Sequence, residues 1–199
     1  MDWERPADKA GVGMGPDYWR DVAGRNSLLR SRYPLDHVVT GRVVDSPARW
    51  GVAGIFVDLG GDPAVVGFVD LIDLAESVKD WPAIDTNSSF MVTDHVNGQV
   101  RMKPLDPAFR RSVPFRPPVS DAPWSALTAR YPAGSVVTGT VHQIYWPTSN
   151  YWVDFGQDSA NVDFGDAAPP AVGSVARYVV GPHLNGLRKL QLHPAPPSK

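Results

Sequence analysis

The sequence predicts an all-β protein that contains two tandem five-stranded barrels, each with a short lead-in helix. Two observations support this prediction: a long internal repeat, and short β-type segments that occur in the same order in each copy. Residues 27–43 are identical to residues 125–141 at ten of 17 positions. A match of this length indicates a duplicated structural unit.

The repeat continues along the chain with a spacing of 96 residues instead of 98. Residues 55–60 (Ile-Phe-Val-Asp-Leu-Gly) match residues 151–156 (Tyr-Trp-Val-Asp-Phe-Gly), and Asp70 recurs as Asp166. The change of spacing predicts a loop of different length between the first and second strands. The same spacing predicts that Asp166 is the counterpart of Asp70.

Each copy contains short segments that are rich in Val, Ile and Phe and bounded by Gly, Pro and Asp, as is typical of strands. In the first copy they span residues 38–45, 54–60 and 65–70. Asn97 and Gly98 lie between apolar-alternating flanks and predict a two-residue hairpin, because a type I′ turn needs positive φ at both central residues. These signals give about five strands per copy.

Three helices are predicted beside the strands. Residues 71–78 indicate a short helix between the third and fourth strands, which residues 167–170 of the second copy lack. Asn26 and Ser27 are N-cap candidates for the first lead-in helix, and residues 121–123 (Asp-Ala-Pro) start the second.

The domain organisation follows from the repeat and from the prolines between its copies, which favour a stiff, extended linker. The predicted units are an N-terminal extension at 1–26, a first barrel domain at 27–105, a proline-rich linker at 106–122, a second barrel domain at 123–194 and a tail at 195–199.

Composition argues against several classes of protein. The chain has no cysteine, so it has no disulfide, thiol nucleophile or cysteine-ligated zinc. Its apolar runs are strand-sized and its first residues lack the apolar core of a signal peptide, so we expect a cytoplasmic protein with no membrane partner. The five histidines show no metal-ligand spacing and no nucleophile elbow occurs. We therefore expect no catalytic residue, no metal, no cofactor and no enzymatic activity.

Three blocks of the first copy, at 39–43, 54–60 and 67–70, resemble the S1 domain family of OB folds in sequence and order. They are similar to the family's V-x-G-x-V, G-A-F-V-D-L-G and G-L-V-H blocks. With the repeat, the resemblance covers roughly two-thirds of the chain. It implies two S1-like OB barrels that bind single-stranded RNA or DNA on an open barrel face.

The resemblance also implies which residues contact nucleic acid. On the second strand, inward Val57 and Leu59 leave Phe56 and Asp58 pointing outward. An outward aromatic is a stacking surface for an unpaired base, and packing within the protein is the alternative role. The implied contacts are Phe56 with its counterpart Trp152, the nearby Trp50 and Trp146, and the basic pair Arg188 and Lys189.

The distribution of charge along the chain is also compatible with a second hypothesis, that the protein binds a protein partner. Residues 31–105 hold six Lys/Arg against ten Asp/Glu, a net charge of −4, and no basic stripe crosses either copy. Asp70 and Asp166 stand where the family commonly has histidine. An interaction module for a protein partner, such as an antitoxin, an immunity protein or a complex subunit, is therefore the alternative. Its partner-binding residues would be Asp58, Asp70 and Asp166.

Overall fold

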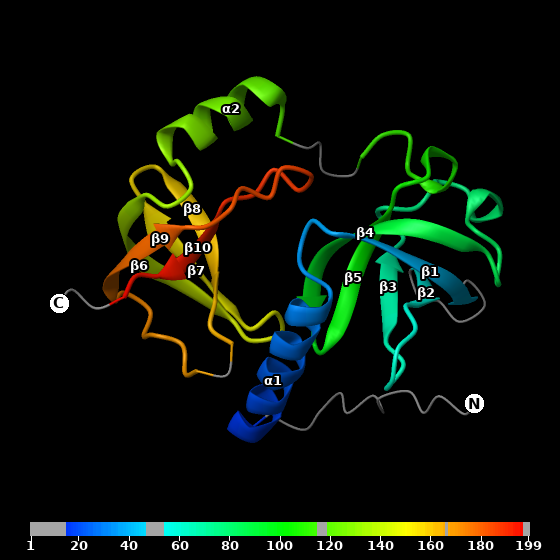
Figure 1. The fold of residues 1–199 in the computed structure, drawn as a ribbon, viewed down its shortest axis with the longest axis horizontal. Helices are drawn as coiled ribbons and strands as arrows, with labels where there is room; N and C mark the ends of the chain where they lie inside the picture. Colours follow the sequence, from blue (N-terminus) through cyan, green and yellow to red (C-terminus); the bar gives the residue numbers. More distant parts are fainter. Residues whose placement is uncertain (1–14, 47–53, 115–118, 166, 197–199) are drawn as a thin grey trace.

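The strands of this chain form two separate closed barrels of five strands each, as predicted (Figure 1). The computed structural model describes residues 15–46, 54–114, 119–165 and 167–196. The first barrel contains β1 (Val38–Asp45), β2 (Gly54–Asp58), β3 (Val66–Asp70), β4 (Asn87–Val96) and β5 (Gln99–Pro104). The second contains β6 (Val136–Tyr145), β7 (Asn150–Phe155), β8 (Asp158–Asp163), β9 (Val175–Val180) and β10 (Gln191–Pro194).

Both barrels have the same strand order. The first runs β1-β2-β3-β5-β4 and closes on β1, and the second runs β6-β7-β8-β10-β9 and closes on β6. The β3–β5 and β8–β10 pairs are parallel, and the other pairs are antiparallel. A closed five-stranded barrel with this connectivity is an OB-like fold. The tandem arrangement of two such barrels is therefore confirmed.

Alternation along the strands separates each core from the outer face of its barrel. On β2, Ile55 and Val57 are fully buried in the first core, while Phe56 and Asp58 point outward. The hairpin between β4 and β5 also has its predicted form, because Asn97 has a φ of 55° and Gly98 a φ of 73°. These local signals gave correct predictions because each depends on only a few neighbouring residues.

Residues 71–78 do not form the predicted helix. The chain makes a turn after Asp70, whose side chain accepts a hydrogen bond from the Ile72 N–H. The backbone of Leu74 then pairs with Arg110, so it cannot continue a helical ladder. Two short 3-10 turns are the helical structure nearby, η2 at Val78–Asp80 and η3 at Pro107–Phe109.

The first lead-in helix begins well before its predicted start near Asn26. Helix α1 spans Pro16–Arg32, with Gly15 as its N-cap residue and proline in its first turn. The second, α2, spans Asp121–Arg130, at the predicted place. Within the described ranges, no helix combines the length and the apolar character that crossing a membrane requires.

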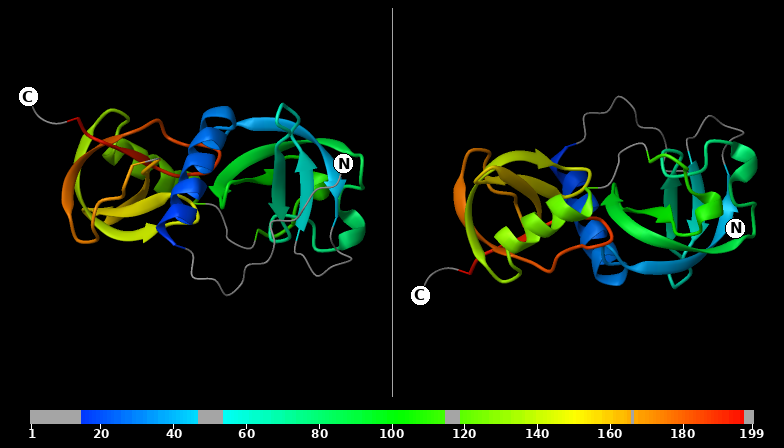
Figure 2. Two further views of the ribbon diagram at one scale, coloured as in Figure 1. Left: turned by 90° about the horizontal axis from the view of Figure 1, so that it is seen from below. Right: turned by 90° about the horizontal axis from the view of Figure 1, so that it is seen from above.

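Helix α1 lies between the two barrels, and three views of the ribbon agree on this placement (Figures 1 and 2). Ala23 belongs to the core cluster of the second barrel, whereas Leu29 and Tyr33 belong to that of the first. Asn26, between these positions on the helix, is fully buried. The helix thus joins the two cores, and its 17 residues exceed the 10 of α2, the lead-in helix of the second barrel.

The strand register corrects one pairing of the repeat. Asp70 of β3 lies opposite Gly54, and in the second barrel Asp163 of β8 lies opposite Asn150. Gly54 and Asn150 are 96 residues apart, so Asp163 is the structural counterpart of Asp70. The prediction that Asp166 has this role is wrong, because the turn between β7 and β8 is shorter than the turn between β2 and β3. Asp166 itself lies outside the described residues.

Candidate nucleic-acid interface

A cleft of about 220 Å³ lies between the two barrels. One wall is the outer face of β7, β8 and β10, together with residues 184–190 that lead into β10. The opposite wall comes from Leu35 and from Thr93 and Asp94 of β4, and Arg30 of α1 borders the cleft between the walls. Both barrels and the joining helix therefore contribute side chains to one site.

Trp152 presents an indole ring to this cleft. Its neighbours on β7, Tyr151 and Val153, point into the core, so alternation turns Trp152 outward, and the residue is 37% exposed. Trp152 lies opposite Asn161 of β8, which lies opposite Gln191 of β10. A row of one aromatic and two amide side chains thus crosses the outer face of the second barrel.

The basic pair Arg188 and Lys189 also lines the cleft. Arg188 has a left-handed backbone conformation with a φ of 53°, and its guanidinium donates a hydrogen bond to Asp121 at the start of α2. The structure therefore brings together three of the six residues predicted to contact nucleic acid.

Arg30 places a third cation in the cleft. Its guanidinium lies 3.2 Å from the Asp163 carboxylate and donates a hydrogen bond to the Thr148 carbonyl. Burial raises the pKa of Asp163, and the neighbouring Arg30 charge partly opposes this rise. Burial likewise raises the pKa of Asp94, which approaches from the first barrel. The Arg30 charge thus lowers the pKa of two carboxylates that belong to different barrels, against the effect of their burial.

The first barrel does not repeat this arrangement. Phe56, the counterpart of Trp152, lies opposite Phe68, and their ring centroids are 5.1 Å apart. Phe68 lies opposite Arg101, whose guanidinium carbon is 4.6 Å from the centre of that ring. Phe68 is buried although it points away from the core. The aromatic rings on this face therefore pack on one another and on Arg101. The sequence argument considered Phe56 without its strand partners, so it did not predict this packing.

Asp58 and Asp70 share the outer face of the first barrel with Phe56, because all three hold outward positions on paired strands. Asp58 lies 3.9 Å from Arg42 and accepts a hydrogen bond from the Gly60 N–H. These carboxylates lie away from the cleft, since neither lines it. Their predicted role in binding a partner stays a prediction.

Trp146 also lies apart from the cleft. It follows β6, where its ring packs against Trp19 of α1 at 6.4 Å and edge-on against Phe164 at 5.6 Å. Through these two contacts, Trp146 attaches helix α1 to the second barrel. Trp50 lies outside the described residues.

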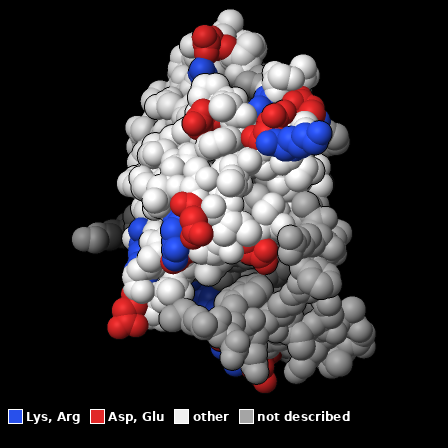
Figure 3. Space-filling model, turned by 90° about the vertical axis from the view of Figure 1, so that its right-hand side faces the viewer, with Lys and Arg blue, Asp and Glu red and all other residues white. Residues whose placement is uncertain are grey.

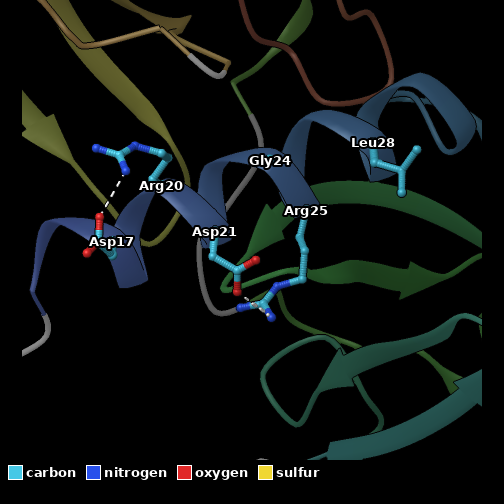
Figure 4. Close-up of a pocket in the computed structure, with 6 residues that line it drawn as sticks. All are labelled: Asp17, Arg20, Asp21, Gly24, Arg25 and Leu28. Carbon is cyan, nitrogen blue, oxygen red and sulfur yellow. Dashed lines mark hydrogen bonds and ion pairs between the residues drawn. The ribbon is translucent and has the colours of Figure 1, made fainter.

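Charges elsewhere on the described surface are mixed in sign. The face in Figure 3 shows acidic and basic side chains next to one another among uncharged ones. Along the exposed side of α1, Arg20 pairs with Asp17 and Arg25 with Asp21, each at 2.9 Å, beside an open pocket (Figure 4). No cluster of three or more potential metal ligands occurs among the described residues.

No family model matches this chain, and no curated protein matches it. Among solved structures it is similar to a multidomain protein with nucleic acid binding domains from Streptococcus pneumoniae, with 18% identity over 84% of this chain and 54% of that chain and a TM-score of 0.31. It is also similar to Drosophila Unr CSD456, with 12% identity over 82% of this chain and 63% of that chain and a TM-score of 0.26. The chain spans less than two thirds of each of these proteins. The OB-like assignment depends on the strand order of the barrels and not on these likenesses.

Proposed function

We propose that this chain is a non-enzymatic, S1-like protein of the cytoplasm that binds single-stranded RNA or DNA in the cleft between its barrels. The observation that carries the proposal is the exposed Trp152 ring on the outer face of the second barrel. It lies in a cleft with amide side chains on one side and basic residues at its edge. Unpaired bases stack on such rings, and cations beside them attract the phosphates.

The two barrels contribute differently to this function. The second barrel provides the stacking ring, the amides Asn161 and Gln191, and the cations at the edge of the cleft. The first barrel provides the opposite wall through β4, while its own outward aromatics are packed together. A cleft with two walls accepts a single strand and excludes a duplex, whose bases are already paired and stacked.

Replacing Trp152 with alanine is expected to weaken binding of an unstructured oligonucleotide by about 1–3 kcal/mol, the contribution of one stacked base. Fluorescence anisotropy with labelled single-stranded RNA and DNA measures this loss. Tyr145→Ala is the matched control, because Tyr145 is a similarly exposed aromatic of the second barrel that does not line the cleft.

The two aromatic variants separate the possible outcomes. A loss of affinity in Trp152→Ala alone supports the cleft as the binding site. Equal affinities in both variants and the wild type would exclude the cleft, even if the chain binds nucleic acid. If no single-stranded oligonucleotide binds at all, the function proposed here is wrong and the protein-partner hypothesis remains.

Replacing both Arg188 and Lys189 with glutamine is expected to flatten the salt dependence of binding. Each phosphate contact on a single strand contributes about 0.7 to the slope of log K against log salt concentration, so losing two contacts lowers the slope by about 1.4. Affinities measured over a series of salt concentrations give this slope. An unchanged slope would show that neither side chain contacts a phosphate.

A further inference from the structure

A loop of the second barrel reaches across to the first. In the first barrel a tight turn connects β4 to β5, whereas in the second barrel residues 181–190 lie between β9 and β10. This longer connection, here called the arm, extends from the second barrel towards the first (Figure 1). The Gly186 N–H donates a hydrogen bond to Asp36 Oδ2 at 2.9 Å, and the Gly186 carbonyl accepts one from Lys103 Nζ at 3.4 Å. The arm therefore connects the two barrels.

The arm is anchored to its own barrel through α2. His183 Nε2 lies 2.9 Å from the Tyr131 carbonyl at the end of that helix. The indole N–H of Trp124, a buried residue of α2, donates a hydrogen bond to Asn185 Oδ1 at 3.2 Å. If the two barrels separate, we therefore expect the arm to stay with the second barrel and to lose its contact with the first.

The contact between the arm and the first barrel is weakly held. Its two hydrogen bonds lie at the surface, where water replaces such bonds at little net cost. Gly186 packs so closely on Asp36 that a Cβ at position 186 would overlap Oδ1 of the carboxylate. This buried oxygen has no hydrogen-bond partner among the described residues, a cost that opening relieves by exposing it to water. The connection through Asn26 differs, because that side chain is fully buried and hydrogen-bonded.

The cleft lies between these two connections. Arg30 borders it on the side of α1, and Leu35 and Leu184 line it next to the contact between Asp36 and Gly186. Its volume of about 220 Å³ is smaller than the roughly 300–1,000 Å³ of sites that hold drug-sized ligands. A nucleotide is a ligand of that size. A strand of several nucleotides therefore needs a wider cleft than the arm leaves in this structure.

We propose that the contact of the arm with Asp36 and Lys103 is a clasp that opens to admit a single strand, while the barrels pivot at α1. This inference rests on the proposed function, because it requires a strand in the cleft. The closed clasp competes with the strand, so the apparent affinity is the intrinsic affinity multiplied by the fraction of molecules whose clasp is open. Weakening the clasp therefore strengthens binding, and locking the clasp prevents it.

A disulfide provides the lock. The chain has no cysteine, so the Asp36→Cys, Gly186→Cys double variant offers a single pair of thiols. Gly186 is not in the left-handed backbone region, so it accepts a side chain without backbone strain. Fluorescence anisotropy with a labelled oligothymidine and the corresponding uridine RNA measures the affinity of the oxidised and the reduced forms. We expect the oxidised form to bind at least about tenfold more weakly and reduction to restore binding.

Two single variants test the clasp without a disulfide. Asp36 has a φ of 66°, which both glycine and asparagine tolerate, and either replacement removes the same charge. Asp36→Asn keeps an oxygen acceptor for the Gly186 N–H, whereas Asp36→Gly removes it. We expect Asp36→Gly to bind the same oligonucleotides about three- to tenfold more tightly than Asp36→Asn, the range that one net hydrogen bond contributes.

The outcomes separate the clasp from the function that it serves. Equal binding by the oxidised and the reduced double variant would overturn the clasp while leaving single-strand binding intact. Equal or weaker binding by Asp36→Gly relative to Asp36→Asn would overturn it too. If neither the wild type nor any of these variants binds an oligonucleotide, the proposed function is wrong instead.

Discussion

Replacing Asn26 with alanine is expected to lower the free energy of unfolding by about 4 kcal/mol and to loosen the two barrels from each other. The Asn26 amide nitrogen donates to Ser149 Oγ at 2.9 Å and to the Pro147 carbonyl at 3.0 Å. Its Oδ1 accepts from the Gly98 N–H at 2.8 Å. One fully buried side chain thus connects α1, the β4–β5 hairpin and the β6–β7 loop. Alanine leaves several groups unpaired, each at a cost of about 1–3 kcal/mol.

Denaturant unfolding measures the loss of stability, and small-angle X-ray scattering measures the separation of the barrels. Leu28→Ala is the control on the same helix, because Leu28 is 66% exposed and alanine preserves helix propensity. Asn26→Asp should be at least as damaging, since it keeps the acceptor for Gly98 but places an oxygen against the Pro147 carbonyl. Equal stability of the Asn26 and Leu28 variants would show that this contact does not hold the barrels together.

Lowering the pH from about 7 to 4 is expected to destabilise the first barrel by about 3 kcal/mol through His95 alone. This imidazole is fully buried, and its Nε2 lies 2.9 Å from the Tyr33 carbonyl at the end of α1. Burial, assisted by the Arg30 charge, lowers the pKa of His95 from 6.5 to about 4. Between these values the unfolded chain binds a proton that the folded chain does not. The contribution of neutral His95 to the free energy of unfolding is therefore complete above about pH 6.5, and it is lost as the pH falls towards 4.

The imidazole resonances of His95, followed by NMR, report its pKa directly. His95→Gln keeps a donor for the Tyr33 carbonyl but cannot titrate, so its stability should fall less steeply than that of the wild type over the same pH range. Titration of His95 near pH 6.5 would refute this explanation. A His95→Gln variant with the wild-type pH dependence would do so too.

The barrels were predictable because their signals are local. The strands follow from β-branched runs, the β4–β5 hairpin from Asn97-Gly98, and the duplication from identities that survive in the sequence. The start of α1 was not predictable in this way. Asn26 is a polar residue before an apolar stretch, so it resembles an N-cap, but its hydrogen bonds to distant loops bury it in the middle of the helix. Tertiary contacts overrode the local preference.

The site was predictable only in part, for a related reason. Alternation along one strand suffices to predict that Trp152 points outward. Arg188 and Lys189 could be identified because they lie near the end of the second copy of the repeat. Arg30 reaches the cleft because α1 lies between the barrels, which no periodicity indicates. Asp163 was missed because a shorter turn changes the repeat spacing after β7, so the sequence alignment assigned its position to Asp166. Insertions in turns are weakly marked in sequence, yet they change which residues are equivalent.

The placement of α1 has a consequence for how the chain assembles. The helix precedes the first barrel in the chain, yet Ala23 lies in the core of the second. During synthesis, this side of α1 therefore stays uncovered until the ribosome has made β6 and β7, more than a hundred residues later.

If the chain were cut in the linker between η3 and α2, the helix would remain with the first fragment while part of its packing surface belongs to the second. The two fragments should therefore associate when mixed, so the protein is suited to fragment complementation, with the barrels as its halves and α1 as the element that joins them.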